Sequence, residues 1–125
     1  MPIHHNRVFT MENTDFLKSK AFKVSEVIEY VPNSVVIKSI IKKLTGNISA
    51  VSFDSGELLS GKKSAFETFI QIIEGNAEVI IDDKSILLET GQSIIIPANT
   101  SNTIKANEKF KMLSTLIKSG YEEVS

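Results

Sequence analysis

Cysteine and tryptophan are absent from this 125-residue sequence, and histidine occurs only at positions 4 and 5. Without cysteine the chain has no disulfide framework, no thiolate metal site and no thiol nucleophile. Its charge is nearly balanced, with 14 Lys and Arg against 15 Asp and Glu and a formal net charge of −1. This balance argues against a nucleic-acid partner, which would favour a basic surface. No apolar run approaches the ~18 residues of a membrane span, so no membrane partner is expected either.

The amino-terminal residues lack the apolar segment of a secretion signal, which predicts a cytoplasmic protein. Apolar residues make up 42% of the chain, enough for a folded core rather than a disordered chain. There is no internal repeat, low-complexity tract or linker, and the length suits one domain. We therefore predict a single folded domain.

Short β-branched runs separated by turn residues dominate the sequence from residue 34 onward. They are too short and too branched to favour helices, and their connections are too short for parallel crossovers, which need about a dozen residues. The pattern predicts an all-β, antiparallel fold closed as a sandwich or barrel. The expected strands are 35–41, 48–53, 68–73, 77–81, 85–88, 93–96, 102–105 and 110–117.

The first 33 residues do not show this pattern of short β-branched runs. We predict that residues 1–33 form an arm packed on the barrel or on a partner subunit, that 34–118 form the barrel, and that 119–125 are a tail. Two helical turns are expected in the arm, at 13–17 and at 25–30, the second capped by its first residue, a serine.

Two glycine-framed segments carry a resemblance to a known family. The first opens at Gly56 and closes at Gly75 in an Ile-Ile-Glu-Gly turn, and the second places Gly91 six residues before Pro97. Glycine takes positive φ freely at sharp turns, and proline ends a strand because it cannot donate to the ladder. The two motifs and their short spacing resemble the cupin superfamily, in particular its small single-domain conserved-barrel (RmlC-like) members, over residues 34–118. The resemblance implies a jelly-roll barrel, also called a double-stranded β-helix.

The metal ligands of typical cupins have unusual counterparts here. The resemblance matches the two histidines of the HxH motif, the following glutamate and the histidine of the second motif to Lys62, Ser64, Thr68 and Asn102. A protonated lysine has no lone pair and repels a dication, and transition metals prefer imidazole or carboxylate to hydroxyl and amide oxygens. We therefore expect no metal and no other cofactor.

The two histidines do not restore a metal site. His4 and His5 lie in the arm, and adjacent residues on a strand face opposite ways, so both would not bind one ion there. Whether the arm brings either histidine to a pocket stays open from the sequence.

The leading functional hypothesis is a metal-free cupin that binds a small polar or anionic molecule in the barrel, with no catalytic residue assigned. The mouths of β-barrels are common places for small-molecule sites. The candidate ligand-binding residues are Lys62, Ser64, Glu67, Thr68, Gln71 and Asn102.

Two alternatives stay open. One is a metal-independent isomerase or lyase in which Glu67 is the base and Lys62 its electrostatic partner, which requires both side chains in one cavity. The other is a structural or interaction module whose barrel is filled by its own side chains, and a cavity well below ~300 Å³ would favour it.

A homodimer is also expected. The runs 79–81 and 94–96 are apolar on both faces, whereas a half-buried strand would alternate. Their outer faces therefore need a cover, either the arm or a second subunit, because exposed apolar patches on soluble monomers are usually small.

Overall fold

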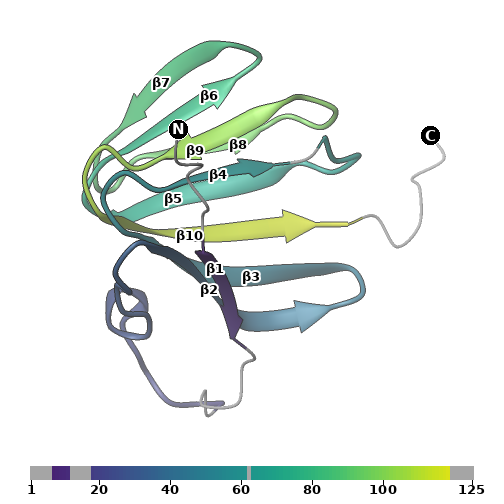
Figure 1. Ribbon diagram of the computed structural model, residues 1–125. Helices are drawn as coiled ribbons and strands as arrows, with labels where there is room; N and C mark the ends of the chain where they lie inside the picture. The colour runs from purple at the N-terminus through teal and green to yellow at the C-terminus, as the bar shows by residue number, and fades with distance from the viewer. Residues whose placement is uncertain (1–6, 12–17, 62, 119–125) are drawn as a thin grey trace, which may run out of the picture.

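The described chain folds into two β-sheets that face each other (Figure 1). The computed structural model of the protein describes residues 7–11, 18–61 and 63–118. A six-stranded sheet has the order β1-β2-β3-β10-β5-β8, and a four-stranded sheet has the order β4-β9-β6-β7. The strands are β1 (Arg7–Met11), β2 (Ser34–Lys43), β3 (Gly46–Phe53), β4 (Leu58–Gly61), β5 (Thr68–Glu74), β6 (Ala77–Ile81), β7 (Lys84–Leu88), β8 (Ser93–Ile96), β9 (Asn102–Lys105) and β10 (Phe110–Ile117).

The predicted antiparallel jelly roll is confirmed. Every strand pair in the described residues is antiparallel except β1 and β2, which are parallel. The sequence analysis missed β1 and the short β4, which pairs with β9 across four residues. Both strands are exposed or only half buried along their length, so neither shows the apolar run that marks the others.

Local sequence accounts for the tight connections. Asp82 and Asp83 form the two-residue turn between β6 and β7 with φ of 46° and 68°, the left-handed conformation that hairpin turns require. Gly75 takes φ of 85°, and a Cβ there would lie 2.7 Å from the Lys109 carbonyl oxygen. The chain therefore turns from β5 into β6 only because residue 75 has no side chain.

The main core lies between the two sheets and closes one end of the barrel. The rings of Phe53 and Phe110 stack there, with centroids 4.5 Å apart and an angle of 12° between their planes. Ala77, Leu88 and Ala106 are buried in the same cluster. Apolar side chains fill the interior of the barrel at this end, so a site inside the barrel lies toward the other end.

A second apolar cluster lies on the outer face of the six-stranded sheet, under the segment 24–31. Ile28 is buried there against Val36, Ile40 and Ala50 of β2 and β3. Figure 1 shows this segment below the sheet, on the side away from the four-stranded sheet. Part of the predicted arm therefore covers the barrel of its own chain.

Side chains of the sheet satisfy the backbone of this segment. Lys38 Nζ donates to the Val27 carbonyl oxygen at 3.2 Å, and Ser52 Oγ donates to that of Glu29 at 2.8 Å. Lys111 Nζ donates to the Ser25 carbonyl oxygen at 2.6 Å, although its residue is only 8% exposed. A carbonyl oxygen loses its hydrogen bonds to water when it is buried, and these three side-chain donors replace them.

The predicted helical turn at 25–30 is wrong in extent and in its cap. The structure has only a 3-10 turn over Val24–Glu26, whose N-cap is Lys23, without a side-chain capping bond. The helical geometry ends at Val27, and the carbonyl oxygens of Val27 and Glu29 accept hydrogen bonds from the sheet rather than from a further helical turn. The other predicted turn, at 13–17, lies outside the described residues. In the described part no helix is long and apolar enough to cross a membrane.

Tyr30 connects the same segment to the end of β5. Its hydroxyl donates to Glu74 Oε2 at 2.5 Å, and the Nζ atoms of Lys109 and Lys111 each lie 4.9 Å from its ring centroid. Lys111 Nζ also lies 3.8 Å from Glu74 Oε2. Burial raises the pKa of the Tyr30 hydroxyl, and the hydrogen bond to Glu74 and the charge of Glu74 raise it further.

Replacing Lys111 by methionine should destabilise the protein by about 1–3 kcal/mol, because the buried Ser25 carbonyl then loses its donor. Urea unfolding followed by circular dichroism measures the change. The matched control is Lys109→Met, which removes a cation from the same ring but leaves the Ser25 carbonyl bonded. Equal losses in the two variants would contradict this role of Lys111.

The raised pKa of Tyr30 makes part of the stability depend on alkaline pH. The contribution is fully present below pH ~10, the ordinary pKa of tyrosine, and falls as the pH rises above it, because the unfolded chain ionises first. Wild type should therefore lose stability above pH ~10 more steeply than Tyr30→Phe. Tyrosinate absorbance in a Tyr121→Phe background measures the Tyr30 pKa directly, and a value at or below the ordinary one would contradict the prediction.

Candidate functional site

The open end of the barrel contains a cavity of about 260 Å³ between the two sheets. In Figure 1, β4 and β10 both run toward this end, away from the turns that join β5 to β6 and β9 to β10. The lining comes from both sheets and from the loops at the mouth. It consists of Ile37, Asn47, Ser49, Val51, Leu59, Gly61, Ser64, Phe66, Thr68, Ile70, Ile96, Pro97, Thr100, Asn102, Ile104, Met112, Ser114 and Leu116.

Strand register arranges this lining in rows of increasing depth. Nearest the mouth, Leu116 pairs with Asn47 on one side and Thr68 on the other. The next row holds Ser114, paired with Ser49 and Ile70. Below these rows the lining is apolar.

The deep row comes from both sheets. Met112 pairs with Val51 in the six-stranded sheet, and Leu59 pairs with Ile104 in the four-stranded sheet. The cavity therefore has both polar and apolar side chains near its mouth and only apolar ones at its floor.

Five polar side chains of the lining have unused hydrogen-bonding capacity. Within the described part of the chain, these side chains make no hydrogen bond to another protein group; they are Asn47, Ser49, Thr68, Asn102 and Ser114. Each is half buried. Buried polar groups normally have partners, so these groups are available to water or to a bound molecule.

Two other polar residues at the mouth form hydrogen bonds with nearby backbone groups. Ser64 Oγ accepts a hydrogen bond from the Phe66 amide at 3.0 Å, and Thr100 Oγ1 donates to the Pro97 carbonyl oxygen at 2.8 Å. Their hydroxyls shape the loops around the mouth. They therefore offer less to a ligand than the five side chains below them.

Asn102 reaches the cavity because residue 61 is a glycine. The two residues pair across β4 and β9, and a Cβ at Gly61 would lie 2.4 Å from Asn102 Oδ1. Without that Cβ the amide of Asn102 lies over the backbone of β4. The glycine thus makes room for a polar group at the mouth.

The structure brings three of the six predicted site residues to the cavity and leaves two outside it. Ser64, Thr68 and Asn102 line it, whereas Glu67 and Gln71 do not. Gln71 lies between Ile70 and Ile72, which face the core, so strand alternation turns it outward. The assignment of Glu67 and Gln71 to the lumen is therefore corrected. Lys62 lies outside the described residues.

Glu67 is exposed and lines a separate hollow of about 450 Å³ on the outer surface. Its neighbours there are Ala65, Phe69, Ile95 and Ile117. The isomerase or lyase hypothesis required Glu67 inside the barrel, so the structure removes the base on which that hypothesis depended.

Asn47, Ser49, Thr100 and Ser114 line the cavity but were missed in the sequence analysis. A signal was present for Ser114, which interrupts the apolar strand Phe110–Ile117 at an inward position between Met112 and Leu116. Ser49 and Asn47 become recognisable only through their register with β10. Register across strands that are distant in sequence is not visible in the sequence.

The lining does not fit a resident transition metal. Ser64, Thr68 and Asn102, which the family resemblance matches to metal ligands, offer only hydroxyl and amide oxygens. Within residues 7–11, 18–61 and 63–118, no group of three His, Cys, Asp or Glu side chains is close enough to hold an ion.

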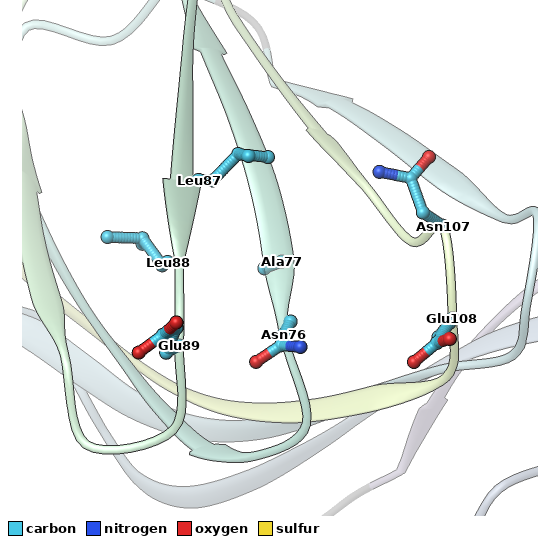
Figure 2. Close-up of a pocket in the computed structure, with 7 residues that line it drawn as sticks. All are labelled: Asn76, Ala77, Leu87, Leu88, Glu89, Asn107 and Glu108. Carbon is cyan, nitrogen blue, oxygen red and sulfur yellow. The ribbon is translucent and has the colours of Figure 1, made fainter.

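A second hollow, of about 320 Å³, lies at the opposite end of the molecule (Figure 2). Figure 2 shows Leu87 and Glu89 on one segment, Asn76 on the next and Asn107 and Glu108 on a third. All five of these residues are exposed. Solvent-exposed carboxylates at the rim of a hollow do not by themselves form a binding site. This hollow is therefore a weaker candidate for the functional site than the barrel cavity.

Beside this hollow, Glu78 accepts hydrogen bonds from Ser85 Oγ at 2.5 Å and from Asn107 Nδ2 at 3.1 Å. These bonds, with the nearby charge of Lys105, lower the pKa of the Glu78 carboxyl. The carboxylate thus holds the β9–β10 loop against β6 and β7. Its hydrogen bonds give it a structural role.

Neither a protein-family model nor a curated protein matches the sequence. Solved structures do match. A conserved protein of unknown function from Streptococcus pyogenes shares the fold with a TM-score of 0.79 at 22% identity, over 85% of this chain and 93% of that one. A cupin superfamily protein from Desulfitobacterium hafniense has a TM-score of 0.77 at 25% identity, over 82% of this chain and 94% of that one.

A third match is a cupin 2 conserved barrel domain protein from Leptotrichia buccalis. Its TM-score is 0.74 at 29% identity, and the match covers 78% of this chain and 47% of that one. Two facing sheets in jelly-roll order, with a cavity at one end, define the class as a small β-barrel. Within that class the chain has the cupin fold of these structures, as its glycine-framed motifs predicted.

Proposed function

We propose that this cupin binds a small polar molecule in the open end of its barrel and uses no metal to do so. The observation that carries the proposal is the set of five half-buried polar side chains that face one cavity without a protein partner in the described residues. Small-molecule sites combine an apolar wall with a few convergent polar groups. The lining of this cavity has that composition.

The cavity volume also bears on the alternative of a filled structural barrel. At about 260 Å³ the cavity is close to the lower end of the range for ligand sites and far larger than a single water needs. A barrel filled by its own side chains would leave less space. We therefore favour a binding protein over a purely structural module.

No catalytic role is proposed. The lumen residues in the described part of the chain are neutral, and none is an acid or base that exchanges protons near neutral pH. Hydroxyls and amides position a molecule through hydrogen bonds. Binding is the function for which this set of side chains is suited.

The test compares thermal unfolding with added metals and with a library of small polar molecules. We expect Mn²⁺, Fe²⁺, Ni²⁺ and Zn²⁺ to leave the unfolding temperature nearly unchanged. A ligand at about 100 times its Kd should raise the free energy of unfolding by about 2.7 kcal/mol. Thr68→Leu narrows the cavity and should abolish the stabilisation by the ligand. The control is Thr115→Leu, which makes the same change on the outer face of β10 and should be stabilised by the ligand as wild type is.

Elemental analysis of the purified protein tests whether the site is free of metal. A transition metal present at one equivalent, and lost in Asn102→Ala, would contradict the proposal of a metal-free site. Stabilisation by a ligand that persists unchanged in Thr68→Leu would place binding elsewhere on the protein.

We further propose that the protein is a homodimer that buries the apolar outer surface of β5, β8 and β10. Phe69, Ile95 and Ile117 are 41%, 56% and 70% exposed there, and Phe69 pairs with Ile95 across the two strands. In this part of the chain no described segment covers them. Exposed apolar surface of this kind favours association with a second copy.

Ile95→Glu should convert the dimer to a monomer, because it would bury two unpaired carboxylates at the interface. Light scattering coupled to size-exclusion chromatography measures the mass. The control is Leu87→Glu on the other sheet, at a side chain that is 71% exposed, which should remain dimeric. A monomeric wild type at high concentration would refute the proposed dimer.

A further inference from the structure

We infer that the molecule bound in the barrel is uncharged and amphiphilic, with hydroxyl or amide groups at one end and a short apolar group at the other. This inference rests on the proposed function and specifies the chemical class of the ligand. Three features of the cavity support it: the order of its rows, the neutrality of the lining residues that the structure describes, and the size of the cavity.

The polar side chains of the strands lie in the two upper rows, beside Leu116, Ile96 and Ile70, whereas the floor is entirely apolar. Asn47, Thr68 and Asn102 are at the level where β3, β5 and β9 meet the open end, and Ser49 and Ser114 lie one row deeper. The strands leave no polar side chain in the row of Met112 and Val51. A bound molecule gains most when its apolar end contacts that floor and its polar end lies between the two upper rows.

A row of three serines crosses the sheet beneath the mouth. Ser49 pairs with Ser114 on β10 and with Ser39 on β2. Ser39 lies two residues after Ile37, which lines the cavity, and its hydroxyl is buried with no hydrogen-bond partner in the described part of the chain. Ser39 does not itself line the cavity, but Ser49 and Ser114 do. Hydroxyls both donate and accept, so these two serines suit a ligand with alcohol or amide groups.

Every lining residue in the described chain is uncharged, so an anion would enter without a counter-charge from them. Transferring an ionised carboxylate out of water without a paired cation is strongly unfavourable, whereas a neutral amide or alcohol keeps hydrogen bonds to the five free groups. This electrostatic difference favours the neutral member of any pair of otherwise similar molecules.

The cavity volume limits the ligand to a small molecule. About 260 Å³ lies below the 300–1,000 Å³ that is typical of sites for drug-sized molecules. A short branched amide meets this limit and has the polar and apolar ends that the row order requires.

The experiment titrates 15N-labelled full-length protein with matched neutral and anionic probes. The pairs are isobutyramide with isobutyrate, and isovaleramide with isovalerate. We expect the amide signals of residues 68, 102 and 114 to shift with the neutral member of a pair, at a Kd at least about tenfold lower than that of the acid. That affinity should not change when NaCl rises from about 50 to about 500 mM, since no ion pair is involved.

Two threonines on opposite faces provide matched variants. Thr68→Val keeps the side-chain shape but removes a lumen hydroxyl, so the neutral probe should bind about three- to tenfold more weakly. Thr115→Val makes the same change on the outer face of β10 and should leave the affinity as in wild type. Both substitutions conserve volume, and the spectrum shows directly whether each variant is folded.

The outcomes separate this inference from the proposed function. If the acids bind more tightly and their binding weakens with salt, the lumen binds molecules but the neutral class is wrong. If no probe of either kind shifts the lumen signals, both the neutral class and the binding function fail. Equal weakening in Thr68→Val and Thr115→Val would also overturn the inference.

Discussion

Strand alternation on β5 and β10 is the constraint on which the rest of the molecule depends. β10 is paired along its length with β3 on one side and β5 on the other, so its register decides which side chains face the barrel. Phe110 and Met112 fill the core, and Ser114 and Leu116 follow on the same face toward the mouth. One strand therefore supplies the closed end, the floor and part of the polar rim of the cavity.

The outer face of the same sheet is organised by a different requirement. The segment 24–31 brings apolar side chains onto β2 and β3, and its carbonyls must be satisfied away from water. Lys38, Ser52 and Lys111 supply the donors. A buried lysine is retained here because a backbone carbonyl and the nearby Glu74 compensate for its charge. The barrel and its cover are thus held by hydrogen bonds as well as by apolar burial.

The strands of the barrel could be predicted from the sequence, whereas the residues of its cavity could be predicted only in part. The strands from Thr68 to Ile117 were recognisable because each is a short apolar run between turn residues, and the glycines at 56, 75 and 91 adopt the positive φ that the motifs predicted. Only some of the residues of the candidate site were predicted correctly. Thr68 and Asn102 line the lumen, but Glu67, directly before Thr68, lies on the outer surface.

The sequence by itself determined the fold class, the positions of the tight turns and the shortage of metal-binding side chains at the matched positions. Those properties are local, since they follow from residue type and from spacing within one strand or turn. Only the tertiary structure decided that Asn47, Ser49 and Ser114 share one cavity with Thr68 and Asn102. Their meeting depends on register between strands up to about seventy residues apart, which is set by the packing of two whole sheets rather than by any neighbouring residue.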